Sequence, residues 1–257
     1  MKIIIGFIIM SLGFVIALEE LDQNLAQIWD LIAFAMVCFG TLAVAVMTMP
    51  SLKLRHILRI LKNGLGKNHG LREECIENSL YFLQNKTVKT HADRIDVRIL
   101  EDGLELMQLG FSKDKIENIL SDRINKYTED FMVVGGWVRG LSKYPPAFGL
   151  AGTVLGLIHL MKGLGEGTDP KETGLRMAIA LVATFYGIIV ANIFVNPIGD
   201  RVITNVREDQ NLAEISLNTI LMMSDQKDFV EIVENLSSNI PSQYKKLNFN
   251  YGLLEAS

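Results

Sequence analysis

Apolar and charged residues are segregated into long blocks along this chain. Four blocks are almost entirely apolar, and they cover residues 3–18, 26–49, 145–163 and 177–197. A helix that crosses a bilayer needs roughly 20 apolar residues, because each residue adds about 1.5 Å to its length. The pattern therefore predicts four transmembrane helices, with a long charged segment between the second and the third.

The charged segment between the second and third apolar blocks is itself predicted to be helical. It contains no proline, and its apolar residues recur at helical spacing. The recurring residues are Ile76, Leu80 and Leu83, and then Ile99, Leu100, Leu104 and Met107. Gly110 is expected to end one helix before Ser112 caps the next. The predicted fold class is all-α: a polytopic membrane protein with four transmembrane helices and a helical cytoplasmic domain.

The orientation of the chain follows from the charges after the second apolar block. Between Pro50 and residue 67 there is no acidic residue, and the charged or titratable ones are Lys53, Arg55, His56, Arg59, Lys62 and Lys67. Basic flanks stay on the cytoplasmic side of a membrane. With four spans, both termini are then cytoplasmic as well.

These patterns divide the chain into four predicted sections. Residues 1–50 hold transmembrane helices 1 and 2, and residues 51–131 form the cytoplasmic helical domain. Residues 132–200 hold transmembrane helices 3 and 4 with a cytoplasmic extension, and residues 201–257 form a cytoplasmic C-terminal helical tail.

The third and fourth apolar blocks carry stripes of small residues. The stripes consist of Gly149, Gly152 and Gly156, and of Ala180, Thr184, Gly187 and Ala191. In lipid, helices associate through close packing and polar contacts, and small side chains let their backbones approach. We therefore expect these positions to be helix-packing sites and to offer a surface on which a partner helix packs.

Each stripe also contains one hydroxyl, from Thr153 and Thr184. A polar group at mid-membrane depth suggests a function, such as lining an ion path. The alternative is a hydroxyl that bonds to a carbonyl of its own helix. Pro146 and Pro197, at the cytoplasmic ends of the two blocks, either end a helix at the interface or act as hinges.

Composition excludes several classes of function. Among the 257 residues there are only two cysteines, no metal-ligand spacing, no phosphate-binding glycine loop and no nucleophile with a plausible base. Basic residues are matched by acids through most of the polar part, so nucleic-acid binding is not indicated. We predict that the chain is not an enzyme and uses no cofactor. The core of the hairpin lacks Asp, Glu, Lys and Arg, so a cation path there needs a carboxylate from a partner helix.

Two stretches carry a resemblance to a known family. They read P-A-F-G-L-A-G-T-V-L-G-L-I from Pro146 and A-L-V-A-T-F-Y-G-I-I-V-A-N-I-F-V-N-P-I from Ala180. With four spans, the chain resembles the flagellar stator family of MotA and PomA, within the wider MotA/TolQ/ExbB proton channel group. The resemblance implies a bacterial inner-membrane subunit that forms a pentamer around a single-span MotB- or PomB-like partner, which supplies an ion-carrying aspartate. It also implies torque on the rotor protein FliG.

Carried over by position, the resemblance assigns Thr153 and Thr184 to the ion path and Pro146 and Pro197 to coupling. Sodium-type members often have a threonine where this chain has Ala183, so the cation is H+ with Na+ as the alternative. The rotor contact is expected at Lys86, Lys89, Asp93 and Arg94. Two other functions stay open: an energiser of another machine, such as outer-membrane transport, gliding or defence, and a passive membrane scaffold.

Overall fold

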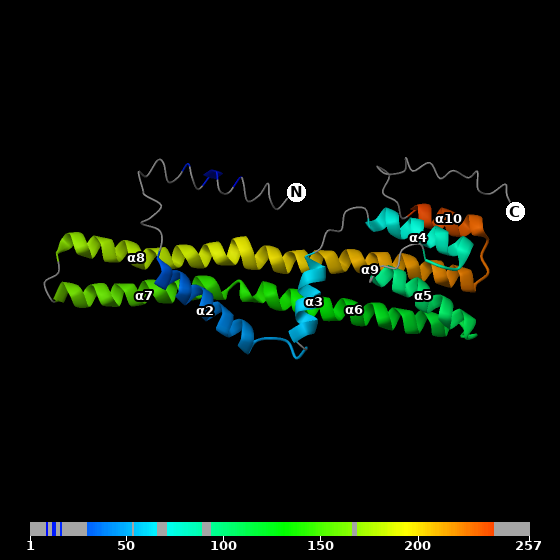
Figure 1. The fold of residues 1–257 in the computed structure, drawn as a ribbon, viewed down its shortest axis with the longest axis horizontal. Coiled ribbons are helices and arrows are strands. Elements are labelled where there is room, and N and C mark those ends of the chain that lie inside the picture. Colours follow the sequence, from blue (N-terminus) through cyan, green and yellow to red (C-terminus); the bar gives the residue numbers. More distant parts are fainter. Residues whose placement is uncertain are drawn as a thin grey trace. The chain divides into compact units, whose positions relative to one another are not determined.

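A computed structural model describes residues 30–52, 54–65, 71–88, 94–165 and 169–238, together with residues 9, 12, 13 and 16. Figure 1 shows the helices, which are the only regular elements in these ranges. In chain order they are α2 (Leu31–Met47), α3 (Leu54–Gly64), α4 (Leu71–Asn85), α5 (Ile95–Gln108), α6 (Lys113–Leu141), α7 (Tyr144–Gly165), α8 (Pro170–Ile189), the π-helical η2 (Val190–Val195), α9 (Asn196–Ser224) and α10 (Phe229–Ser238). The prediction of an all-α fold is confirmed for this part of the chain. Most of the predicted first span, and Lys89 and Asp93, lie outside the described residues.

The chain forms two compact units, and each is made from two separate stretches. The first unit combines the chain up to Leu52 with Gly136–Gly199, and the second combines Lys53–Gly135 with the chain from Asp200 onward. In the first unit α7 and α8 lie side by side as an antiparallel hairpin, and α2 packs against both (Figure 1).

Long apolar helices are present where two of the spans are predicted. Among the described residues, the stretches Lys113–Gly163 and Ala180–Ser224 are long and apolar enough to cross a membrane, by length and composition. Helix α2 is a shorter apolar helix of 17 residues. Its N-terminus is capped by the Asp30 carboxylate, which accepts hydrogen bonds from the backbone N–H groups of Ile32 and Ala33.

The joint between α6 and α7 lies just before the proline pair. The sequence pattern places the end of the first helix at Tyr144, but α6 ends earlier, at Leu141, and α7 already begins at Tyr144. Pro145 and Pro146 therefore occupy the first turn of α7. Proline is tolerated there because the N–H groups of a first turn have no partner within the helix.

Pro197 does not end a helix. One of the two interpretations of this residue, that it ends a helix at the membrane interface, is therefore wrong. The chain continues from α8 through six π-helical residues, Val190–Val195, into α9. The N–H of Asn196 donates to the carbonyl of Ala191, five residues back. A proline inside an α-helix clashes with the carbonyl four residues earlier and lacks the N–H to bond it, and the wider π-helical turn relieves that conflict.

The core of the second unit confirms the predicted helical faces. Ile76 and Leu83 of α4 are buried, as are Ile99 and Leu100 of α5. Gly110 adopts a φ of +76° after α5, the N–H of Phe111 donates to the carbonyl of Leu106, and the N–H of Gly110 donates to that of Met107. These two bonds are the Schellman pattern that ends a helix, so the predicted stop at Gly110 is confirmed.

Candidate ion path in the helical hairpin

Helices α7 and α8 approach so closely that several positions have no space for a side chain. A β carbon on Gly149 would lie 2.7 Å from the carbonyl oxygen of Ala183, and one on Gly156 would lie 2.5 Å from the β carbon of Ala180. A β carbon on Gly152 would lie 2.8 Å from the β carbon of Ala183. The glycine stripe of α7 therefore faces α8 directly, as expected for small residues at a helix contact.

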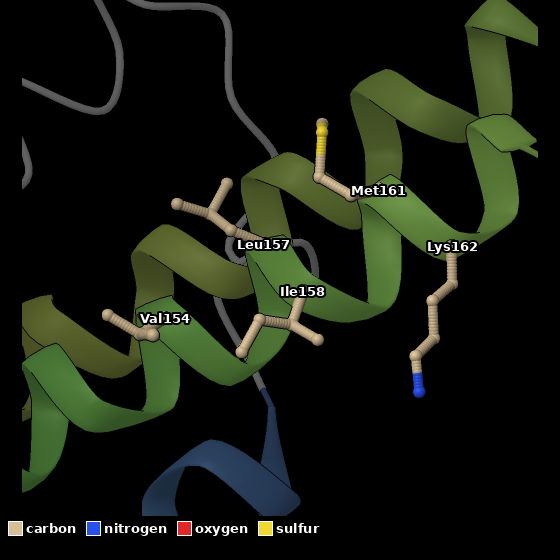
Figure 2. A pocket seen from close by; sticks show the side chains of 5 residues that line it. All are labelled: Val154, Leu157, Ile158, Met161 and Lys162. Carbon is tan, nitrogen blue, oxygen red and sulfur yellow. The ribbon is translucent and has the colours of Figure 1, made fainter.

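The glycines of the α7 stripe and Ala180 and Gly187 of the α8 stripe lie in the contact between the two hairpin helices, whereas Thr184 stays partly exposed. That the stripes also offer a surface for a partner helix stays a prediction. The face of α7 that is open within this chain instead carries larger apolar side chains. Val154, Leu157, Ile158 and Met161 line a hollow of about 470 Å³ together with Lys162 (Figure 2).

The two threonines lie together at the centre of the α7–α8 contact. Their hydroxyl oxygens are 2.5 Å apart. The Thr153 oxygen also lies 3.1 Å from the carbonyl oxygen of Ala180 on α8 and 3.2 Å from that of Gly149 on its own helix. A hydroxyl has one proton to donate, so if Thr153 donates to a carbonyl, Thr184 donates to Thr153.

The contacts of Thr153 agree with both interpretations of these hydroxyls, a bond within the same helix and an oxygen that lines an ion path. The bond from Thr153 to Gly149 ties the hydroxyl to its own helix, as in many membrane helices. The contacts to Ala180 and Thr184, however, gather three oxygen atoms from two helices at one place. Thr153 is 9% exposed, whereas Thr184 is only partly buried. Such oxygens can replace part of the hydration shell of a cation, and Thr184 is the one that remains accessible.

The apolar stretches of α7 and α8 around this oxygen cluster contain no carboxylate. From Tyr144 to Met161 and from Met177 to Gly199 there is no Asp, Glu, Lys or Arg. A proton or sodium ion that dwells in a membrane needs a stronger ligand than a hydroxyl, since a bare charge at that depth is expensive. The site is therefore incomplete within these two helices.

Helix α2 adds one feature that the sequence analysis missed. Phe34 of α2 packs edge-on against Tyr186 of α8, with ring centroids 5.6 Å apart. The hydroxyl of Tyr186 accepts a hydrogen bond of 3.2 Å from the backbone N–H of Asp30. Tyr186 lies two residues after Thr184. The presence of a tyrosine inside an apolar block could have indicated this contact, because a buried phenol hydroxyl usually has a hydrogen-bond partner.

The proline predicted at the base of the third span lies in the same helix contact. A β carbon on Gly187 would be 2.5 Å from the carbonyl oxygen of Pro145 and 2.9 Å from the α carbon of Pro146. The first turn of α7 is thus in backbone contact with α8. Pro197, by contrast, lies in the first turn of α9, directly after the π-helical segment.

Of the four residues predicted to contact a rotor, the structure describes Lys86 and Arg94, and they differ in exposure. Lys86 is exposed at the end of α4, in a left-handed conformation with a φ of 56°. Arg94 precedes α5, and its side chain is only 18% exposed. It forms a bidentate pair with Asp96, at 3.0 and 2.7 Å, and a further ion pair of 2.8 Å with Glu74 of α4.

Arg94 belongs to a buried polar cluster in the second unit. Asp96 is 2% exposed, and burial together with the nearby Asp96 carboxylate raises the pKa of the Cys75 thiol to about 12. Burial also raises the pKa of Asp209, which accepts a 3.0 Å hydrogen bond from the hydroxyl of Tyr127. Among the described residues no group of His, Cys, Asp and Glu side chains is arranged to hold a metal ion.

Comparison with known proteins supports a single family. The sequence model of the MotA/TolQ/ExbB proton channel family matches residues 91–215. The chain is 28% identical to chemotaxis protein PomA of Vibrio alginolyticus over 158 residues, which cover 62% of this chain and 58% of PomA. It is 26% identical to motility protein A of Cereibacter sphaeroides over 200 residues, which cover 76% of each chain.

The fold agrees with the sequence comparison. The flagellar MotAB stator complex from Bacillus subtilis contains a chain that superimposes with a TM-score of 0.78 and 18% identity, covering 97% of this chain and 99% of that one. Members of the matched family are ion channel stator components and not enzymes. The matched sequence model, the relatives and the shared fold together support the MotA/PomA family of flagellar stator subunits as the group that this chain resembles.

Proposed function

We propose that this chain is the ring-forming, ion-conducting subunit of a bacterial flagellar stator. In this proposal α7 and α8 are the third and fourth membrane spans, α2 is the second, and residues 3–18 form the first. The protein lies in the inner membrane with both termini in the cytoplasm, and the second unit, from Lys53 to Gly135 and from Asp200, is cytoplasmic. The basic segment after Pro50 supports this orientation.

The observation that carries the proposal is the oxygen cluster of Thr153 and Thr184. Two hydroxyls and a carbonyl meet between two apolar helices that supply no carboxylate. We propose that a cation, H+ or alternatively Na+, passes the accessible side of Thr184 while bound to an aspartate of a MotB- or PomB-like partner. One charge that crosses 100 mV releases about 2.3 kcal/mol, which is comparable to the free energy of a few side-chain contacts.

The open face of α7 supports an assembly of several copies around that partner. Val154 and Ile158 are 48% and 49% exposed. An uncovered apolar face suits lipid or another helix. We propose a pentamer of this subunit around two partner copies, as the family resemblance implies.

Coupling of ion passage to rotation is assigned to the two proline positions. Pro146 contacts Gly187 at the base of the hairpin, and Pro197 follows the π-helical segment at the base of α8. We propose that these joints transmit the ion-driven change to the cytoplasmic unit, which exerts torque on FliG. Lys86, Lys89, Asp93 and Arg94 remain the proposed rotor contact.

One observation favours the second candidate, an energiser of a different machine. Arg94 is held inside the protein by Asp96 and Glu74, so it presents little charge to a rotor. An energiser of outer-membrane transport, gliding or defence would use the same hairpin with a different cytoplasmic contact.

The assembly is tested by the mass of the detergent-solubilised complex, purified through this chain after co-expression with the product of the neighbouring gene. A ring of several copies that contains fewer copies of a single-span, aspartate-bearing protein is the expected result. A monomer, or a ring without such a partner, would contradict the proposal, because the ion path would have no carboxylate.

Conduction is tested with Thr184→Val, which removes a hydroxyl at nearly constant volume. The loss of one hydrogen-bonding oxygen from the path should lower ion flux by about tenfold. Thr41→Val is the control, because it makes the same chemical change in α2, where the Thr41 hydroxyl donates to the carbonyl of Val37 in its own helix. Unchanged ion flux in a correctly assembled Thr184→Val complex would contradict the assignment of Thr184 to the ion path.

A further inference from the structure

Helix α3 has two apolar faces, and only one of them is covered. Ile57 and Ile60 are each 1% exposed, so this face packs into the second unit. Leu54 and Leu58 are each 57% exposed and, one turn apart, form a separate stripe along the helix. Leu65, just beyond the end of α3, extends this stripe and is 45% exposed.

Cations line the exposed leucine stripe on one side. At 100° per residue, Arg55, Arg59 and Lys62 fall next to Leu54 and Leu58 and away from the buried isoleucines. All three cations are exposed. No acidic residue occurs between residues 51 and 72, so nothing in this segment neutralises them.

The side of α3 beyond the cations is fixed to the body of the unit. The Nε2 of His56 lies 3.4 Å from the Oδ2 of Asp130 on α6. In Figure 1, α3 runs across the direction of α6.

We infer that the leucine and cation faces of α3 form a binding surface for anionic phospholipid, with the leucines among the acyl chains and the cations at the headgroup phosphates. An amphipathic helix with basic residues beside its apolar stripe binds membranes in this manner, and each Lys or Arg adds attraction to anionic lipid. Six residues separate Met47, where α2 ends, from Leu54, so α3 starts close to the membrane. The inference rests on the proposed function to the extent that α2 spans the membrane.

The three cations favour an anionic lipid headgroup over the other molecules that could cover this face. A second copy of the chain would meet the leucines as well, but α3 itself has no acid with which to pair the three cations. A zwitterionic membrane surface would accommodate the leucines but would exert no net attraction on the cations. The surface is therefore expected to distinguish phosphatidylglycerol from phosphatidylcholine.

The test is hydrogen exchange of the full chain in nanodiscs of pure phosphatidylcholine and in nanodiscs containing phosphatidylglycerol. The amides of α3 should exchange at least tenfold more slowly with the anionic lipid, because the three cations add attraction to the anionic surface. The variant Arg55→Gln/Arg59→Gln should lose this difference. Its matched control, Lys115→Gln/Arg207→Gln, removes two exposed cations elsewhere in the same unit and should keep it.

A further variant, Leu58→Gln, should speed exchange of α3 in both lipids. Equal exchange of α3 in the two lipids, or slowing that persists in Arg55→Gln/Arg59→Gln, would overturn the inference. The amides of α7 and α8 separate this result from a failure of the proposed function. If these helices stay protected in both lipids, only the lipid site is wrong; if they exchange freely, the membrane assignment itself fails.

Discussion

Gly187 lies against Pro145, with a carbonyl oxygen only 2.5 Å from the place that a β carbon of residue 187 would occupy. Gly187→Ala should therefore push α8 away from the first turn of α7. Overpacking of a tight contact costs about 1–3 kcal/mol. The midpoint of thermal unfolding of the solubilised protein should fall accordingly.

Gly136→Ala is the control for this substitution. Gly136 also lies within a helix, but a β carbon there would have open space around it beyond the backbone of its own helix. Replacing an unhindered helical glycine by alanine stabilises by about 0.5–1 kcal/mol. Equal effects of the two substitutions would contradict the close approach of α7 and α8.

Asp209 makes the stability of the second unit depend on pH. Burial raises the pKa of its carboxyl, although the Tyr127 hydroxyl donates to it. The folded protein then holds the proton more tightly than the unfolded chain, so this group adds stability at low pH and loses it as pH rises through the folded pKa. Asp209→Asn should raise the unfolding midpoint at pH 7, and the gain should shrink in acid.

Tyr127→Phe is the complementary change, because it removes the bond that favours the charged carboxylate. Its destabilisation should be largest at pH 7 and smaller in acid. A pH profile of unfolding midpoints that is parallel for wild type and both variants would show that Asp209 does not titrate differently on folding.

Lys86 adopts a left-handed conformation, which disfavours a residue with a β carbon. Lys86→Gly should stabilise the protein by about 0.5–1 kcal/mol and at the same time remove a predicted rotor-contact charge. Gln226→Gly is the control, since Gln226 has a similar φ of 54° and no charge. If Lys86→Gly cells lose motility while Gln226→Gly cells swim, the charge and not the fold is responsible.

Cys75 should be inert to alkylation while the protein is folded. Its side chain is fully buried, and burial raises the pKa of the thiol from 9.0 to about 12. The thiolate is the reactive form of cysteine, and the raised pKa keeps the thiolate fraction very small at pH 8. In a Cys38→Ser background, maleimide should label the chain only after denaturant is added; rapid labelling of the native protein would refute the burial of Cys75.

The sequence was sufficient to predict features that depend on local spacing. The helical periodicity of Ile76 and Leu83 indicated their burial, and Gly110 indicated a helix end, because glycine is favoured where φ is positive. The contact of Gly149 and Gly156 with α8 also follows from small residues recurring at helical spacing.

Features that depend on a distant partner were not predictable. The interaction of Arg94 with Glu74 and Asp96 requires the packing of α4 beside the start of α5, and 20 residues separate Arg94 from Glu74. The same pattern of charged residues in the sequence fits both an ion pair inside the protein and an exposed surface that contacts a partner. The continuation of the chain past Pro197 was missed for a related reason: a proline predicts a conflict in the helix, but not whether the backbone resolves it by ending or by widening.

The π-helical segment Val190–Val195 also bears on how this chain tolerates change in length. Such a segment accommodates one residue more than the α-helix it interrupts, and one residue corresponds to a turn of roughly 100° about the helix axis. A one-residue deletion here would convert the segment to ordinary α-helix and rotate every side chain from Asn196 onward relative to those of α8. The segment therefore sets the angular phase between the side chains of α8 and those of α9, and homologues that differ in length by a single residue at this place would differ in that phase.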